Sequence, residues 1–342
     1  MTAAPLSLPG HEPLVVSTRG DGVESVYYGS IAVATAAGEL LGGVGDTAFP
    51  VFTRSALKPF QALPFVAGGG PGRFGFSSRQ VALLCASHSG EPRHVAAVAD
   101  MLARIGCSAA DLQCGSHVPL FYSATGAQLP PNLEPTPLQH NCSGKHTGFL
   151  AWCRQHGEPT GDYLDPGHPV QQAVRHTLAD MVGCPESAIP MGIDGCSAPN
   201  YALPLARLAQ AYARLATPGQ PGAEGAALAT LFRAMTAHPE MISGEARNDL
   251  FLMQAGAGDW VAKGGAEGVQ AIGVASRGLG IAIKIADGSP RAVQVAVAAA
   301  IAQLGLADFS REDALGRWQA GEIRNYAGRR TGRFMPVFRL AG

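Results

Sequence analysis

The sequence predicts a mixed α/β fold of the α+β kind, in which strands from both ends of the chain form one antiparallel sheet. Strand-like alternation lies near the N-terminus, apolar residues at helical spacing dominate the middle, and strand-like runs return near the C-terminus. Helices packed on the sheet and a helical insert fit this order. We expect a single domain over residues 1–342, with the sheet layer at about 1–54 and 256–342 and the helical part at about 55–255.

The N-terminal strands are separated by glycine-containing turns, and an apolar helix follows them. Strands are predicted at 14–18, 25–34 and 40–45, and a short extended run at 49–53 leads into a helix at 55–66. Further helices are predicted at about 77–86, 92–105, 147–155, 169–182, 200–216, 223–237 and 290–305. Further strands are predicted at 260–263, 269–276, 280–285 and 335–340.

The composition argues against several classes of protein. The net charge is −1 and the basic residues form no stripe, which argues against binding nucleic acid or an anionic membrane surface. No apolar run reaches the roughly 20 residues of a membrane span, and residues 1–13 lack the regions of a signal peptide. The seven cysteines contain no C-x-x-C pair and match no disulfide scaffold. We therefore expect a cytoplasmic protein with reduced thiols.

A Ser-x-x-Lys motif opens the first predicted helix. Ser55 and Lys58 lie three residues apart and so share a helical face, where a desolvated lysine can act as the base that activates the serine. On this motif alone, a capping serine and a solvated lysine explain the pattern better. Two later features change this balance: Ser87 lies in a polar turn after a helix, and Lys263 ends a predicted strand before two glycines.

The order of these motifs mimics that of serine β-lactamases and penicillin-binding proteins. Those enzymes carry Ser-x-x-Lys, then Ser-Asp-Asn, then Lys-Thr-Gly. Here Ser89 stands in place of the asparagine and Gly264 in place of the threonine, so the match is partial. The motif order favours a serine hydrolase.

A second group of side chains is suited to holding a metal. Cys142 and Lys145 lie three residues apart, and Cys196 lies in a glycine-rich turn just after Asp194. Two thiolates, a lysine and a water can form a four-coordinate zinc site with an open position. Two structural thiols in tight turns are one alternative, and a nucleophilic Cys142 is another. The flanking imidazoles are expected to hydrogen-bond to this group, or to serve such a nucleophile as its base: His140 and His146.

Together these motifs resemble those of the rhizobial-type L-asparaginases, class 3 of the L-asparaginase II family. Five stretches carry the resemblance, in family order: 54–61 (RSALKPFQ), 86–91 (ASHSGE), 141–146 (NCSGKH), 192–196 (GIDGC) and 263–268 (KGGAEG). The resemblance implies a fold related to serine β-lactamases and penicillin-binding proteins and a homodimer. It also implies hydrolysis of L-asparagine to L-aspartate and ammonia.

The resemblance also implies roles for single residues. Ser55 is the nucleophile and Lys58 its base partner, and Ser87 and Lys263 are the second serine and lysine. Three residues match the family's ligands for one zinc ion per chain, which is not the hydrolytic group: Cys142, Lys145 and Cys196. We expect the substrate to be bound or oriented by several polar groups: Arg54, His88, Glu91, Asn141, Asp194, Gly264 and Glu267. For Arg54 a surface ion pair is the alternative.

The chain departs from the family pattern in one place, and two other functions stay open. No cysteine follows Cys196, and the run 244–253 has Asn248 and Phe251 where family members carry one. A serine amidohydrolase of other specificity, such as a glutaminase or a β-lactam or peptide amidase, is the first alternative. A non-catalytic zinc- or amino-acid-binding protein is the second. Ammonia release from asparagine and glutamine separates the first, and aspartate binding without turnover would identify the second.

Overall fold

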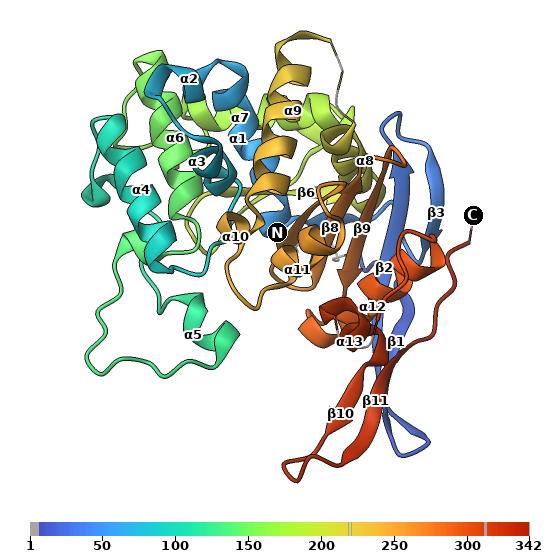
Figure 1. Cartoon of the computed structure of the whole chain (residues 1–342). Coiled ribbons are helices and arrows are strands. Elements are labelled where there is room, and N and C mark those ends of the chain that lie inside the picture. The colour runs from blue at the N-terminus through green and yellow to red at the C-terminus, as the bar shows by residue number, and fades with distance from the viewer. Residues whose placement is uncertain (1–6, 218, 220, 311–312, 342) are drawn as a thin grey trace, which may run out of the picture.

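An eight-stranded antiparallel sheet forms the frame of the molecule. The computed structural model describes residues 7–341 except 218, 220, 311 and 312. The strand order is β10-β11-β1-β2-β9-β8-β7, with β3 paired to β2. The bounds are β1 Glu12–Arg19, β2 Gly22–Thr35, β3 Leu40–Val44, β7 Trp260–Gly265, β8 Val269–Val274, β9 Leu279–Ile285, β10 Glu322–Arg324 and β11 Arg330–Pro336. The N-terminal strands β1 and β2 lie between strands from the C-terminal part of the chain, which confirms the predicted fold class (Figure 1). Residues 1–6 of the predicted sheet layer lie outside the described residues.

Helices cover the centre of the sheet. Nearly every residue of β9 is buried, as expected for a strand covered on both faces. Helix α8 (Leu205–Ala216) packs against β2, β8 and β9, and α12 (Pro290–Gln303) packs against β1, β9 and β11. The approach of α8 is close because glycines face it: a Cβ on Gly280 would lie 1.9 Å from the carbonyl oxygen of Ala209. Any larger residue at position 280 would push α8 away from the sheet.

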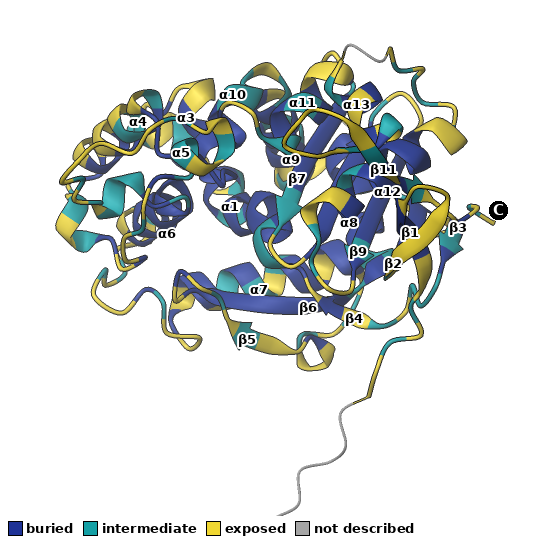
Figure 2. Ribbon diagram, turned by 90° about the horizontal axis from the view of Figure 1, so that it is seen from below, coloured by how far each residue is buried: buried dark blue, intermediate teal, exposed yellow. Residues whose placement is uncertain are grey.

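Apart from α13, which packs on α12 and β11, the remaining helices form the part of the molecule to the left and centre of Figure 1. Its central helix is α1 (Lys58–Ala67), which is apolar and buried nearly all round because α6, α7 and α9 surround it (Figure 2). The other helices are α2 Gly70–Phe74, α3 Ser78–Leu84, α4 Pro92–Arg104, α5 Leu120–Thr125, α6 Ser143–His156, α7 Pro169–Val182, α9 Gly222–Ala237, α10 Pro239–Ile242, α11 Asn248–Ala255 and α13 Ala314–Ala320. No helix in the described part of the chain is both long and apolar enough to cross a bilayer.

Two predicted elements differ from the structure. The helix predicted at 200–216 begins as a strand, β6 (Pro199–Pro204), which pairs with β4 (Pro50–Phe52) and β5 (Met191–Ile193), and α8 follows. Pro204 marks the change because its fixed φ and missing N–H suit a residue just before a helix. The strand predicted at 335–340 ends at Pro336 and starts earlier, at Arg330.

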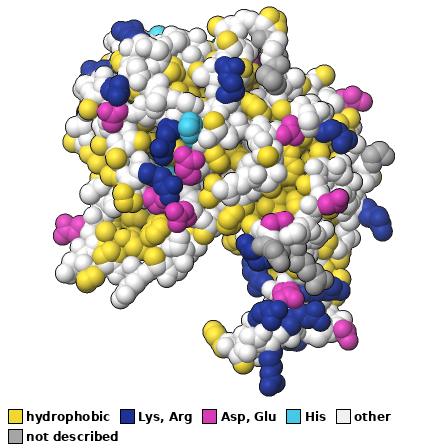
Figure 3. All heavy atoms as spheres, viewed as in Figure 1, with side chains coloured by type: hydrophobic (Ala, Val, Ile, Leu, Met, Phe, Trp, Pro, Cys, Tyr) yellow, Lys and Arg dark blue, Asp and Glu magenta, His cyan; other side chains and the backbone are white. Residues whose placement is uncertain are grey.

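A protruding arm explains the second difference. Strands β10 and β11 form a hairpin whose exposed residues are largely charged, so its strands lack the apolar alternation that the sequence prediction used. Basic side chains gather on this arm at the bottom of Figure 3. The exposed arginines of the hairpin are Arg324, Arg329, Arg330 and Arg333.

The close approach between β9 and α8 gives a stability prediction. Gly280→Ala should lower the free energy of unfolding by about 1–3 kcal/mol, because its new methyl group would overlap the backbone of α8. Urea denaturation measures the change. Gly72→Ala is the matched control, since its Cβ meets nothing within 4 Å and should leave stability unchanged or slightly raised. Equal stability of the two variants would contradict the packing argument.

Candidate active site

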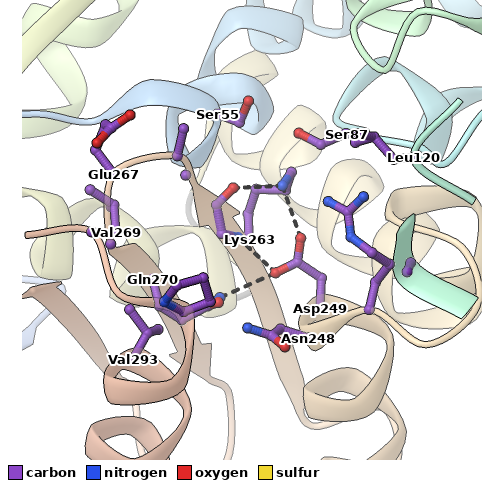
Figure 4. A pocket seen from close by; sticks show the side chains of 18 of the residues that line it. Ser55, Ser87, Leu120, Asn248, Asp249, Lys263, Glu267, Val269, Gln270 and Val293 are labelled. Carbon is purple, nitrogen blue, oxygen red and sulfur yellow. Dashed lines mark hydrogen bonds and ion pairs between the residues drawn. The ribbon is translucent and has the colours of Figure 1, made fainter. Parts of the chain in front are cut away.

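A cavity of about 640 Å³ opens between the edge strand β7, the turn before α1 and the segment before α11 (Figure 4). The predicted site residues that line it are Ser55, Ser87, Asn141, Lys263, Gly264 and Glu267. These residues come from four separate stretches of the sequence. The fold therefore gathers the motifs of the helical part and of the sheet around one space.

The turn that carries Ser55 is fixed from both sides. The hydroxyl of Thr53 donates to the carbonyl oxygen of Tyr201 at 2.9 Å, and the backbone N–H of Thr53 donates to the same oxygen at 3.1 Å. Arg54 has φ +49°, a left-handed conformation that costs a non-glycine residue about 1–2 kcal/mol. On the other side, a Cβ on Gly265 would lie 2.6 Å from the carbonyl oxygen of Thr53. Glycine at 265 thus lets β7 pass directly against the turn that presents Ser55.

Lys58 is buried and hydrogen-bonds to Ser87. Its Nζ donates to Ser87 Oγ at 3.0 Å and to the carbonyl oxygens of Ala86 at 2.5 Å and Asn141 at 3.4 Å. Its amine is thus held by three acceptors from two separate parts of the chain. In the described residues no hydrogen bond joins Lys58 to the hydroxyl of Ser55, the pair that the sequence favoured. The geometry links Lys58 to the second serine instead.

Lys263 is also buried, and a carboxylate compensates its charge. Its Nζ contacts Asp249 Oδ2 at 2.9 Å and the carbonyl oxygen of Gly264 at 2.7 Å. Burial lowers the pKa of Lys263 below its ordinary value. The nearby charge of Lys58 also lowers this pKa, whereas the carboxylate of Asp249 raises it. Asp249 also accepts hydrogen bonds from the Gly264 N–H at 2.7 Å and from Gln270 Nε2 at 3.2 Å. The ion pair holds this lysine in one position against the cavity.

Sequence reasoning missed two charged residues of the cavity. Asp249 lies in the first turn of the apolar helix α11, and Arg247 lies just before that helix. The signal was an acidic side chain in an apolar helical run, which is unfavourable unless it has a partner. No spacing to Lys263 identifies that partner, because the two residues belong to different elements.

Two predicted site residues lie behind the cavity wall. His88 is fully buried: Nδ1 accepts from the Gly90 N–H at 3.1 Å and Nε2 bonds to Ser143 Oγ at 2.9 Å. Burial lowers the pKa of His88 well below its ordinary value, so its imidazole is neutral. Glu91 is buried as well, and it accepts from the N–H of Glu245 at 3.0 Å. These contacts are those of orienting groups, and direct substrate binding by either residue stays a prediction.

Arg54 is engaged by two acids. Its guanidinium pairs with Asp194 at 2.8 Å and with Glu267 at 3.8 Å, and Asp194 also accepts from Asn200 Nδ2 at 3.1 Å. These residues line a second cavity, of about 780 Å³, and Glu267 lines both cavities. A substrate carboxylate would have to displace Asp194 to reach Arg54.

The three residues matched to metal ligands meet in the interior. Lys145 Nζ lies 3.0 Å from Cys196 Sγ, and both side chains are buried with Cys142. A hydrogen bond from Cys142 lowers the pKa of Cys196, while the same contact, followed by burial, raises the pKa of Cys142. Burial acts to lower the pKa of Lys145, but the thiols, Cys196 first, raise it overall. In this arrangement Lys145 donates to Cys196 Sγ, and the Cys142 thiol donates to Asn141 Oδ1 at 3.5 Å.

This donor set fits a zinc ion. Sulfur and nitrogen atoms are the ligands that zinc prefers, and the buried Nε2 of His146 beside them has no hydrogen-bond partner in the described part of the chain. The Nδ1 of the same ring bonds to the hydroxyl of Tyr163 at 2.7 Å. Across the described residues, no three or more side chains drawn from His, Cys, Asp and Glu form a metal cluster, so a zinc site here depends on the lysine.

A family comparison identifies the chain. The model of the family described as L-asparaginase II matches residues 15–336, nearly the whole length. The chain belongs to the L-asparaginase II family. No curated protein matches it significantly.

Solved structures similar to this L-asparaginase II family member are distant. A native crystal structure of Mglu is 15% identical, with 84% of this chain and 67% of that chain covered and a TM-score of 0.44. A β-lactamase/D-alanine carboxypeptidase from Pseudomonas syringae is 13% identical, with 80% and 93% covered and a TM-score of 0.41. A β-lactamase from Mycobacterium bovis is 14% identical, with 80% and 94% covered and a TM-score of 0.34. TM-scores this low add nothing to what the topology shows.

The buried imidazole beside the thiols gives a pH prediction. Burial lowers the pKa of His146 from 6.5 to about 4, against an opposing effect of Cys196. Between these values the unfolded chain binds more protons than the folded one, so the free energy of unfolding should fall as the pH drops from about 6.5 to 4. This residue contributes up to about 1.4 kcal/mol per pH unit to the slope.

Urea denaturation with a metal chelator present, at several pH values, measures this slope. His146→Gln should make it shallower. His176→Gln is the control, because that imidazole is largely exposed. Identical slopes in the wild type and both variants would contradict the prediction.

Proposed function

We propose that this chain is a rhizobial-type (class 3) L-asparaginase, which hydrolyses L-asparagine to L-aspartate and ammonia through a serine acyl-enzyme. The observation that carries the proposal is the gathering of Ser55, Ser87 and the buried Lys263 around one cavity, with the buried Lys58 hydrogen-bonded to Ser87. Membership of the L-asparaginase II family supports the reaction class. A homodimeric assembly and a cytoplasmic location stay predictions.

In the proposed reaction Ser55 attacks the side-chain amide carbon of the substrate. Its hydroxyl proton passes to the oxygen of Ser87, whose own proton passes to Lys58 in its neutral form, as the 3.0 Å contact between Ser87 and Lys58 allows. A C–O bond forms, and the oxyanion is assigned to the backbone N–H of Ser55. The N–H of Gly264 cannot serve, because it donates to Asp249.

The acyl-enzyme forms when the C–N bond breaks. Lys58 returns its proton through Ser87 to the leaving nitrogen, which departs as ammonia. Water then attacks the ester carbonyl carbon, losing its proton along the same path, and the C–O bond to Ser55 breaks as the serine regains a proton. The ion pair of Lys263 and Asp249 stays intact throughout, so Lys263 takes no part in the proton transfers.

The nucleophile assignment is tested by Ser55→Ala. Turnover should fall by roughly 10³-fold or more, because no covalent intermediate can form without the hydroxyl. Ammonia release from L-asparagine measures the change, with folding checked by circular dichroism. Ser123→Ala alters another hydroxyl of the same cavity and should change turnover less than about threefold. Wild-type turnover in Ser55→Ala, with loss of activity in Cys142→Ser, would move the nucleophile to the thiol.

We also propose that Cys142, Lys145 and Cys196 hold one zinc ion per chain. When bound, the zinc would supply positive charge beside the cavity, which Asn141, the residue before Cys142, lines. The ion is not assigned the hydrolytic role, because the serine and lysine groups account for the proton transfers. Lys145 would bind it through the neutral amine, with its proton released on binding.

Metal analysis tests the zinc ligands. Protein purified without chelator should contain about one zinc ion per chain, and the Cys142→Ser/Cys196→Ser double variant should contain none, because it lacks both sulfur ligands. Cys107→Ser/Cys184→Ser is the matched control, since these half-buried cysteines lie outside the group. Stoichiometric zinc in the first double variant would refute the ligand set.

A further inference from the structure

Arg247 places a guanidinium on the cavity wall, and no side chain among the described residues forms a hydrogen bond or ion pair with it. It lies directly before α11 and lines the same cavity as Ser55 and Lys263. Burial lowers the pKa of Arg247 from its ordinary value and Asp249 opposes this, but an arginine stays charged in proteins. In the described part of the chain its side chain makes no hydrogen bond and no ion pair.

The acids that could neutralise this guanidinium are already occupied. Asp249 accepts from three donors, among them Lys263 at 2.9 Å and the Gly264 N–H at 2.7 Å. Glu267, the other acidic residue among the described lining residues, pairs with Arg54 on the far rim. Because Asp249 offsets the charge of Lys263, the positive charge of Arg247 is left uncompensated. The uncompensated positive charge therefore favours binding of an anion in the cavity.

The segment that leads to this guanidinium is held firmly. The Oγ of Ser89 donates to the carbonyl oxygen of Ser243 at 2.6 Å, and the buried Glu91 accepts from the N–H of Glu245 at 3.0 Å. A Cβ on Gly244 would lie 2.2 Å from Glu91 Oε1, so only glycine fits there. The turn that carries Ser87 thus also fixes the chain that precedes the cavity wall at 246–249.

We propose that Arg247 binds the α-carboxylate of the substrate and so selects an amino-acid amide over a simple amide. This inference rests on the proposed function, since it takes L-asparagine as the substrate. A guanidinium meets a carboxylate through two parallel charge-assisted hydrogen bonds, which an ammonium cannot form. Arg54, the arginine that the sequence favoured, is engaged by Asp194. Glu267, whose contact with Arg54 is long at 3.8 Å and whose side chain is 69% exposed, is the acid that we assign to the α-ammonium group.

The test compares two substrates that differ only in the α-carboxylate. 3-Aminopropanamide is asparagine with hydrogen in place of that group. In Arg247→Gln the KM for L-asparagine should rise about 10- to 100-fold with kcat changed much less, because a hydrogen-bonded charge pair is lost. kcat/KM for 3-aminopropanamide should change less than about threefold. Arg247→Lys should recover only part of the loss, because lysine supplies the charge without the bidentate geometry.

A binding measurement keeps the inference testable without turnover. Calorimetry should show that L-aspartate binds the wild type and binds Arg247→Gln at least tenfold more weakly, while β-alanine binds both equally. Arg79→Gln is the matched control, because this arginine pairs with Glu240 outside the cavity. Binding of L-aspartate that weakens in Arg247→Gln, without any ammonia release from L-asparagine, would contradict the proposed function but support Arg247 as the carboxylate-binding residue. An unchanged KM and unchanged aspartate affinity in Arg247→Gln, or no binding to the wild type, would overturn the inference.

Discussion

The contact between the edge strand β7 and the turn before α1 is the constraint on which the site depends. Gly265 lets the strand pass within van der Waals distance of the Thr53 carbonyl, and Arg54 takes up a left-handed conformation in the same turn. A bulkier residue at 265 would separate Ser55, on the helical part, from Lys263, on the sheet. The proposed catalytic groups thus meet because two layers of the fold touch at a position without a side chain.

The two buried lysines are compensated in different ways, and this difference organises the chemistry. Lys263 has an ionised partner in Asp249, so moving its proton would leave a buried carboxylate without its cation, at a cost of several kcal/mol. Lys58 hydrogen-bonds only to a hydroxyl and to carbonyl oxygens, so no carboxylate depends on its charge. The proposed roles, a cation held in an ion pair for Lys263 and a proton acceptor for Lys58, rest on these different partners.

Much of the fold and some of the site could be predicted from the sequence, because the signals were local. Strand alternation and turn glycines predicted most strands of the sheet, and Ser-x-x-Lys marked the start of α1. The features that were not predicted are contacts between distant parts of the chain. The side-chain partner of Lys58 is Ser87, 29 residues away. Asp249 and Arg247 belong to the cavity because the fold places α11 and the segment before it beside β7. Contacts between distant elements carry no spacing in the sequence, so a pattern of residues cannot reveal them.

The burial of α1 has a consequence for how the protein opens. The helix that carries Lys58 is enclosed by α6, α7 and α9, and its amides are shielded along nearly the whole length. Local fraying cannot expose it without disrupting the packing of three neighbours at once. Exposing Lys58 therefore requires cooperative opening of the helical part of the molecule. Ligands must therefore enter at the rim of the cavity, where exposed residues such as Glu267 lie. The proposed chemistry takes place against a close-packed part of the interior.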